Sequence, residues 1–200
     1  SAVSVTADAG HCYATGVTLG SATTADNCSV ASVTNNAPDT FALGATTVTW
    51  TVTDGSGRTA TATQTVTVTD NQNPTITAPA AVSVNTDAGL CTASGVSLGT
   101  PTTADNCSVA SVTNDAPATY NIGSTTVTWT VTDGSGRTAT ATQTVTVTDN
   151  QNPTITAPSA VSVTADAGHC YATGVTLGSA TTADNCSVAS VTNNAPDTFA

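Results

Sequence analysis

The sequence predicts an all-β protein built from small sandwich domains in tandem. Val and Thr alternate over long stretches, which is the pattern of strands with one face in water. The same motifs return at a constant interval, because Cys12, Cys91 and Cys170 are each 79 residues apart. Glu and Lys are absent, and no stretch shows a helical period. A repeat of this length suits an immunoglobulin-like β-sandwich better than a solenoid turn, so we expect such domains arranged head to tail.

Individual strands follow from the apolar alternation and from the turn residues between them. Val48 to Val52 and Thr59 to Thr69 each place Val, Ala or Trp on one face and Thr on the other. Asp54 to Gly57 between them supplies glycines for a tight hairpin turn. Trp50 lies on the inward face of this hairpin, and Trp129 lies on the same face of its copy 79 residues further on, so both are expected in the core. Shorter strands are expected at Ala2 to Val5, Tyr13 to Leu19 and Val30 to Thr34.

The repeat divides the chain into three domains. We expect a first domain at residues 1–73, a complete second domain at 74–152 and a third at 153–200, and we call these the first, second and third repeats. Ser159 to Ala200 reproduces Ser1 to Ala42 letter for letter, whereas the second repeat differs, so odd and even types alternate. We therefore expect the first repeat to be truncated at its start, and the third to lack its C-terminal half, as parts of a longer array.

Composition excludes two classes of function. The 200 residues contain 13 acidic and 2 basic side chains, which gives a net charge of -11 and a pI near 4.1. Such a chain repels a phosphate backbone, so no nucleic-acid partner is expected. No apolar run approaches the roughly 20 residues of a membrane-spanning helix, so no membrane span is expected.

The order of motifs resembles the HYR (hyalin repeat) domain. The motifs are Pro74 to Pro79, Asp87 to Cys91, Ala104 to Cys107 and Thr126 to Gly136. The resemblance covers the whole chain. It implies immunoglobulin-like extracellular modules that are associated with adhesion and often stand in tandem on large bacterial surface proteins.

The six cysteines fall into three pairs of equal spacing. The economical interpretation is a disulfide inside each repeat, which stabilises by about 3 kcal/mol for a loop of this length. The expected pairs are Cys12 with Cys28, Cys91 with Cys107, and Cys170 with Cys186. They indicate an extracellular or cell-surface location. A zinc site at His11, Cys12 and Cys28 is the alternative, but the second repeat has Leu90 in place of His11.

Strand direction predicts where acidic loops meet. In a head-to-tail array the final hairpin turn and the loop between the second and third strands both point toward the preceding repeat. The tail of that repeat enters at the same end. The predicted ligands at this junction are Asp70, Asn71, Asn73, Asp105 and Asp133. Carboxylate and amide oxygens in such number suit Ca²⁺, and Mg²⁺ is less favoured. The pattern is similar to the calcium linkers of cadherins, although ordinary turn chemistry is the alternative.

Two further sets of residues repeat parts of this site. Asp149, Asn150, Asn152 and Asp184 form a partial set at the next junction, and Asp26 with Asp54 forms another at the preceding one.

No catalytic constellation accompanies these motifs, so no enzymatic activity is expected. His11 and His169 are copies of one position, and no Ser stands in a nucleophile-elbow motif. The sequence therefore favours a structural component of an extracellular fibre or adhesin stalk, stiffened by disulfides within domains and by calcium between them. Its partners would be copies of itself in a fibre. One alternative is an array that binds a glycan or surface through avidity, and another is a filament assembled laterally from short subunits.

Overall fold

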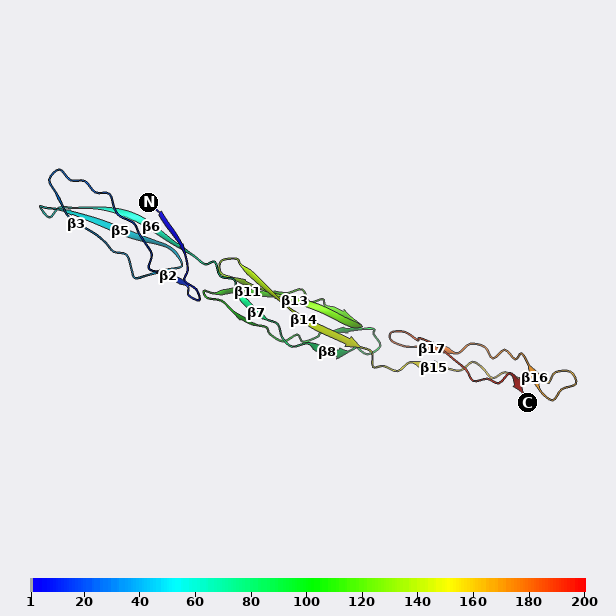
Figure 1. Cartoon of the computed structure of the whole chain (residues 1–200). Helices are drawn as coiled ribbons and strands as arrows, with labels where there is room; N and C mark the ends of the chain where they lie inside the picture. The colour runs from blue at the N-terminus through cyan, green and yellow to red at the C-terminus, as the bar shows by residue number, and fades with distance from the viewer. Residues whose placement is uncertain (1) are drawn as a thin grey trace. The chain divides into compact units, whose positions relative to one another are not determined.

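The computed structural model of the chain describes residues 2–200 (Figure 1). Every regular element in these residues is a β-strand, which confirms the predicted all-β class. The chain forms two compact units. The first contains residues 2–79, 99–115 and 128–142, and the second contains 80–98, 116–127 and 143–200. The boundary between them therefore runs through the second repeat and not between repeats.

The first repeat contains two sheets, a larger mixed sheet and a smaller antiparallel one. Its strands are β1 (Ala2–Thr6), β2 (Tyr13–Thr15), β3 (Val30–Asn35), β4 (Thr40–Ala42), β5 (Gly44–Asp54) and β6 (Thr59–Thr69). The larger sheet has the order β1-β6-β5-β3 (Figure 1). In the smaller sheet β2 pairs with β4. Strand β1 runs parallel to β6, whereas β6, β5 and β3 are antiparallel neighbours.

The core of this repeat lies between the two sheets. Val48, Val66 and Val68 from the larger sheet are at most 1 % exposed, and they pack in one cluster with Ala14 and Phe41 from the smaller sheet. Each buried Val contributes about 1.5–3 kcal/mol relative to an exposed one. The Thr residues that alternate with them along β6 point outward, apart from half-buried Thr67. The alternation of Val and Thr thus produces a sandwich with a thin aliphatic core.

A buried glutamine completes this core. Gln64 is 5 % exposed and accepts a hydrogen bond from Trp50 Nε1 at 2.9 Å. Its own Nε2 donates to the carbonyl oxygen of Leu19 at 2.9 Å. Because both ends of the amide are paired, its burial is tolerated, and it ties the loop at Leu19 to the hairpin.

The second repeat has counterparts of all these strands and adds β7 and β10, whereas the described strands of the third repeat match only β7, β9, β10 and β12 of the second. The second repeat contains β7 (Thr75–Thr77), β8 (Val82–Asn85), β9 (Thr92–Ser94), β10 (Thr102–Ala104), β11 (Val109–Asn114), β12 (Thr119–Asn121), β13 (Gly123–Asp133) and β14 (Thr138–Thr148). Its sheets have the orders β11-β13-β14-β8, β10-β7 and β12-β9. The third contains β15 (Thr154–Thr156), β16 (Ala172–Thr173), β17 (Thr181–Ala183) and β18 (Thr198–Phe199). There β15 pairs with β17, and β16 with β18.

Local sequence signals explain most of these bounds. The hairpin between β5 and β6 forms where glycines were predicted to allow it, and Gly57 has a φ of 82°. The strand expected over Tyr13 to Leu19 ends at Thr15, because Gly16 has a φ of 61° and leaves the extended conformation. The short strands β4, β7 and β10 were not predicted, since three residues are too few for a periodic signal.

Candidate metal centre and the disulfides beside it

The tail that follows β6 is held by a glutamine. Gln72 accepts a hydrogen bond from the backbone N of Gly10 at 2.8 Å through Oε1, and its Nε2 donates to the carbonyl oxygen of Asp8 at 3.1 Å. The backbone N of Gln72 donates to Asp70 Oδ1 at 3.0 Å. Asp70 is 6 % exposed. The turn of the first repeat and its tail therefore fix the Asp70 carboxylate in one position.

Two turns of the second repeat present Asp105 and Asp133. Asp105 Oδ2 accepts the backbone N–H groups of Cys107 and Ser108, both at 2.9 Å. Asp133 Oδ1 accepts those of Ser135 at 2.8 Å and Arg137 at 2.7 Å. In each carboxylate, one oxygen thus accepts the hydrogen bonds that organise its own turn, and the other oxygen points away from that turn.

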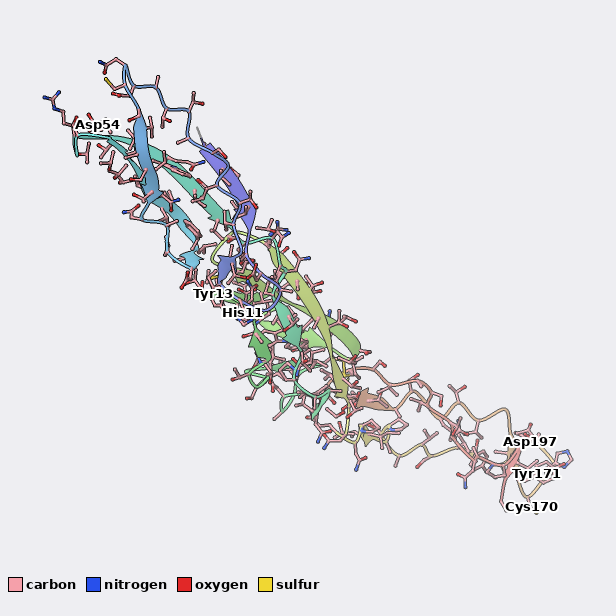
Figure 2. All side chains as sticks on the ribbon, turned by 60° about the vertical axis from the view of Figure 1, so that its left-hand side comes forward. His11, Tyr13, Asp54, Cys170, Tyr171 and Asp197 are labelled. Atoms are coloured by element: carbon pink, nitrogen blue, oxygen red, sulfur yellow. A yellow bond between two sulfur atoms is a disulfide. The ribbon has the colours of Figure 1, made fainter. Side chains whose placement is uncertain are left out.

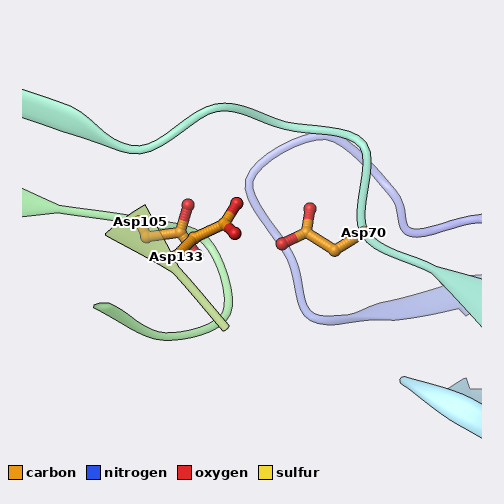
Figure 3. Close-up of side chains that lie close together, drawn as sticks. All are labelled: Asp70, Asp105 and Asp133. Atoms are coloured by element: carbon orange, nitrogen blue, oxygen red, sulfur yellow. The ribbon is translucent and has the colours of Figure 1, made fainter. Parts of the chain in front are cut away.

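The three carboxylates meet at one point (Figure 3). One oxygen from each of Asp70, Asp105 and Asp133 lies within 4.8 Å of the others. The oxygens without a hydrogen-bond partner are Asp70 Oδ2, Asp105 Oδ1 and Asp133 Oδ2, and all three are buried. At this spacing two carboxylates repel each other by about 3 to 4 kcal/mol for an effective dielectric constant near 20. The cluster is therefore costly as it stands and suited to a bound cation.

Asn106 adds an oxygen that the sequence analysis did not assign. Its Nδ2 donates to the carbonyl oxygen of His11 at 2.9 Å and to Asp70 Oδ1 at 3.3 Å. Its Oδ1 is buried without a hydrogen-bond partner. The predicted amide ligands Asn71 and Asn73 are instead exposed. The signal for Asn106 is its place beside Asp105, since an Asp-Asn-Cys motif recurs in every repeat.

The expected disulfides inside each repeat are wrong. The structure joins Cys12 to Cys107 and Cys91 to Cys186, with Cα–Cα distances of 4.7 Å in both bonds, so each disulfide links successive repeats. Cys28 and Cys170 are free and exposed. The expectation failed for Cys12 with Cys28, Cys91 with Cys107 and Cys170 with Cys186. The zinc site at His11, Cys12 and Cys28 fails with it, because Cys12 is consumed by its disulfide.

Strand length is the physical reason for this correction. Cys28 precedes Val30, which pairs with Asp54 at the hairpin tip of β5 (Figure 2). Cys12 lies at the other end of that strand, where Tyr13 pairs with Ala42. Strand β5 has 11 residues. At about 3.3 Å per residue its ends are roughly 30 Å apart, and a disulfide requires Cα atoms within about 7 Å.

The remaining acidic residues form the same turns without a complete cluster. Asp184 Oδ2 accepts the backbone N–H groups of Cys186 at 3.0 Å and Ser187 at 2.9 Å, while its Oδ1 is buried and unpaired. Asp149 Oδ1 accepts the backbone N–H of Gln151 at 3.0 Å. Asn150 and Asn152 are exposed. In the part of the chain that the structure describes, these residues have no third carboxylate beside them.

Asp26 and Asp54 of the first repeat form the same two turns as Asp105 and Asp133. Asp26 Oδ2 accepts the backbone N–H groups of Cys28 at 2.8 Å and Ser29 at 2.9 Å, and these hydrogen bonds lower the pKa of its carboxyl. Asp54 Oδ1 accepts those of Ser56 at 2.8 Å and Arg58 at 2.9 Å. Asp26 is exposed and Asp54 half-buried, so each turn forms without a neighbouring repeat.

Comparison with protein families identifies the repeats. The model of the HYR domain matches residues 6–68 and again residues 69–147. The chain belongs to the HYR family. No curated protein matches it. Among residues 2–200, no helix is present that could cross a membrane.

Solved structures similar to these HYR domains are cadherin ectodomains. The protocadherin GammaB4 extracellular domain is 15 % identical over 79 % of this chain and 33 % of that one, with a TM-score of 0.38. Human CDH23 EC21-23 is 16 % identical over 72 % of this chain and 55 % of that one, with a TM-score of 0.36. Human Protocadherin-24 EC1-2 is 14 % identical over 74 % and 95 %, with a TM-score of 0.37. The chain spans about a third of the first of these proteins, and scores this low carry no inference about function.

Proposed function

We propose that this HYR chain is a non-enzymatic structural component of an extracellular fibre or adhesin stalk of the bacterial surface type. Ca²⁺ and a disulfide together join each repeat to the next. The domains of this array are residues 1–73, 74–152 and 153–200. Its extracellular location is supported by the two disulfides, because such bonds persist in oxidising compartments.

The observation that carries the calcium assignment is the set of buried, unpaired oxygens. Asp70, Asp105, Asp133 and Asn106 each contribute one. A buried polar atom without a partner costs about 1–3 kcal/mol, and a buried charge costs more. The three carboxylate oxygens, which come from three segments, lie within 4.8 Å of one another, and turn chemistry does not explain them because it uses the opposite oxygens of the same carboxylates.

The chemistry of these ligands favours calcium. All four atoms are oxygens, and three belong to carboxylates. Ca²⁺ accepts six to eight oxygen ligands in flexible geometry, so backbone carbonyls and water can complete the set. Mg²⁺ demands a stricter octahedron and retains more water. The bound ion would supply positive charge that offsets the repulsion among the three carboxylates.

The disulfide and the cation site reinforce the same connection. Asn106 immediately precedes Cys107, and its amide bonds both to Asp70 and to the residue before Cys12. Arg137 Nε donates to the carbonyl oxygen of Asp70 at 3.3 Å. These bonds join the tail and turn of the first repeat to two turns of the second, which is the arrangement that a stiff stalk requires.

Matched aspartates test the proposal. Asp133→Asn removes one ligand charge at the cluster, while Asp54→Asn makes the same change in an identical turn outside it. Both variants retain Oδ1 and hence the turn. We expect Ca²⁺ to raise the melting temperature of the wild type and of Asp54→Asn, and to lose most of this effect in Asp133→Asn. A ligand at 100 times its Kd stabilises by about 2.7 kcal/mol. Equal stabilisation of all three proteins would contradict the assignment.

Trypsin supplies an independent readout. The chain has only two basic residues, Arg58 and Arg137, and both stand in the same Gly-Ser-Gly-Arg turn. Arg58 is exposed, whereas Arg137 is half-buried and bonded to the tail of the first repeat. Calcium should slow cleavage after Arg137 and leave cleavage after Arg58 unchanged. Protection of both sites alike, or of neither, would count against a cation at this cluster.

A further inference from the structure

One cysteine of the disulfide between the first two repeats lies directly beside the cation site. Cys107 follows Asp105 and Asn106 in the sequence, and its backbone N–H donates to Asp105 Oδ2 at 2.9 Å. The other oxygen of Asp105 and the Oδ1 of Asn106 belong to the set of buried, unpaired oxygens. Two of the candidate ligands therefore stand within two residues of a disulfide sulfur.

The other cysteine lies at the end of the turn that holds Asp70. The backbone N–H of His11 donates to the carbonyl oxygen of Asp8 at 2.9 Å, which closes this turn just before Cys12. Gln72 binds the same turn through two hydrogen bonds, and its backbone N–H donates to the Asp70 carboxylate. The third candidate ligand is therefore connected to Cys12 through short, local contacts.

The disulfide closes a ring of contacts around the site. Asn106 Nδ2 donates to the carbonyl oxygen of His11 and to Asp70 Oδ1, so the residues that precede the two cysteines are hydrogen-bonded to each other. Cys12 and Cys107 are half-buried, and their Cα atoms are 4.7 Å apart. All these residues belong to the first compact unit. With the S–S bond intact, the turns on either side of it are held at one separation.

We propose that this disulfide sets the calcium affinity of the junction, so that a thiol reductant regulates the cation site. The inference rests on the proposed function, because it concerns the same site. One thiol attacks Cys12 Sγ or Cys107 Sγ and breaks the S–S bond, and a second thiol resolves the mixed disulfide. The two thiols of the reductant end as one disulfide, while Cys12 and Cys107 each take up a proton and become thiols.

Reduction leaves every ligand in the chain but removes the covalent link between the turns that present them. Binding of Ca²⁺ then has to order these turns, and the cost of ordering them is subtracted from the binding free energy. The mutual repulsion of the three carboxylates also favours separation of the turns once the link is gone. We expect the Kd for Ca²⁺ to rise at least about tenfold, which lies within the usual range for coupled sites.

The coupling acts equally in the opposite direction. If the oxidised form binds Ca²⁺ tenfold more tightly than the reduced form, saturating Ca²⁺ makes the disulfide tenfold harder to reduce. For a two-electron couple this factor lowers the reduction potential by about 30 mV. A calcium-loaded junction therefore resists thiols that open the same bond after calcium is withdrawn.

A redox titration tests this coupling without altering a ligand. The free thiols are first removed by Cys28→Ser and Cys170→Ser, because they could exchange with the disulfides. The protein is equilibrated in dithiothreitol buffers with EGTA or with saturating Ca²⁺, quenched with N-ethylmaleimide, unfolded and digested with trypsin. Cys12 is then the one cysteine of the peptide that ends at Arg58, so its alkylated fraction reports the state of the bond.

We expect the reduction potential of this bond to be at least about 30 mV lower in Ca²⁺ than in EGTA. The calcium shift should vanish in Asp133→Asn, which lacks one ligand charge. It should persist in Asp39→Asn, which removes an exposed charge outside the cluster. An unshifted potential would overturn the inference, and so would a shift that survives Asp133→Asn.

Calorimetry measures the calcium side of the coupling. The double variant Cys12→Ser with Cys107→Ser should bind Ca²⁺ at least about tenfold more weakly than the oxidised wild type. Cys28→Ser should bind as the wild type does. Gln64→Ala is the control for lost stability, because it removes a buried, hydrogen-bonded side chain of the first repeat away from the site, and its Kd should also be unchanged.

The outcomes separate this inference from the proposed function. An oxidised wild type that binds no Ca²⁺ would refute the proposed function and the coupling with it. Equal binding by the oxidised wild type and the double variant would refute the coupling alone, as would equal weakening by Gln64→Ala. If the double variant does not fold, the redox titration, which keeps both cysteines, decides the matter.

Discussion

Replacement of single cysteines distinguishes a disulfide between repeats from one within a repeat, because the two patterns predict very different losses of stability. The bond between Cys12 and Cys107 spans 95 residues of sequence. In the chain-entropy estimate, closing a loop of roughly 95 residues stabilises by about 4.7 kcal/mol at 25 °C, before any native strain is subtracted. We therefore expect Cys12→Ser and Cys107→Ser each to lower the free energy of unfolding by about 3–5 kcal/mol. Cys28→Ser should lie within about 0.5 kcal/mol of the wild type, because that thiol is free and exposed.

The assay is urea denaturation followed by tryptophan fluorescence, since Trp50 and Trp129 both lie in the first compact unit. The double variant Cys12→Ser with Cys107→Ser serves as the coupling control, and it should cost no more than either single change. If Cys28→Ser destabilised the protein as much as Cys12→Ser, and Cys107→Ser did not, the bond would close within the repeat and our reasoning about strand length would fail.

Two further predictions concern single side chains. Gln143 is 2 % exposed and donates to the carbonyl oxygens of Ala80 at 2.8 Å and Leu98 at 2.9 Å. Gln143→Ala should therefore lower the free energy of unfolding by about 2–3 kcal/mol, measured by heat or urea. The control Thr140→Ala changes an exposed side chain and should be nearly neutral. The Asp26 carboxyl should titrate below its usual pKa in a carbonyl NMR titration, because backbone N–H groups of Cys28 and Ser29 favour its charged form. The pKa of this carboxyl is depressed in the folded protein, so the stabilisation by this turn is complete above the unfolded pKa and is lost as the pH falls through the folded pKa. Asp26→Asn should remove that acid transition. An unshifted pKa of Asp26 would contradict the turn.

The strands could be predicted from sequence because each depends on a local rule, and the acidic cluster because strand direction determines which loops meet. Alternation along Thr59 to Thr69 specifies which face is buried, and Gly57 specifies where the hairpin turns. The meeting of Asp70, Asp105 and Asp133 followed from strand direction alone, and their carboxylates do lie together. Whether they bind calcium stays a prediction.

The disulfide partners were not predicted, although strand direction excludes a bond within one repeat. Strand direction places the Cys12 loop and the Cys28 loop at opposite ends of a repeat, as β5 shows. The equal spacing of the two cysteines within each repeat favours the wrong pairing, because it takes no account of that distance. Spacing in a periodic sequence cannot distinguish a bond within one repeat from a bond to the next, because both recur with the same period.

Asn106 and Gln64 were missed for a different reason. Each acts through contacts distant in sequence, to His11 and Asp70 in one case and to Leu19 in the other. A polar residue in an alternating strand or a turn predicts only that it needs partners. Which partners it finds is decided by the packing of the sheets.

The most direct test of the account is an experimental map of the crystallised chain with Ca²⁺, in which anomalous scattering marks the ion. We expect one peak between Asp70, Asp105, Asp133 and Asn106, with ligand distances of about 2.3–2.6 Å. A map of the same crystals in which the three carboxylates turn away from one another, or hold only water, would contradict the claim that a cation joins successive repeats.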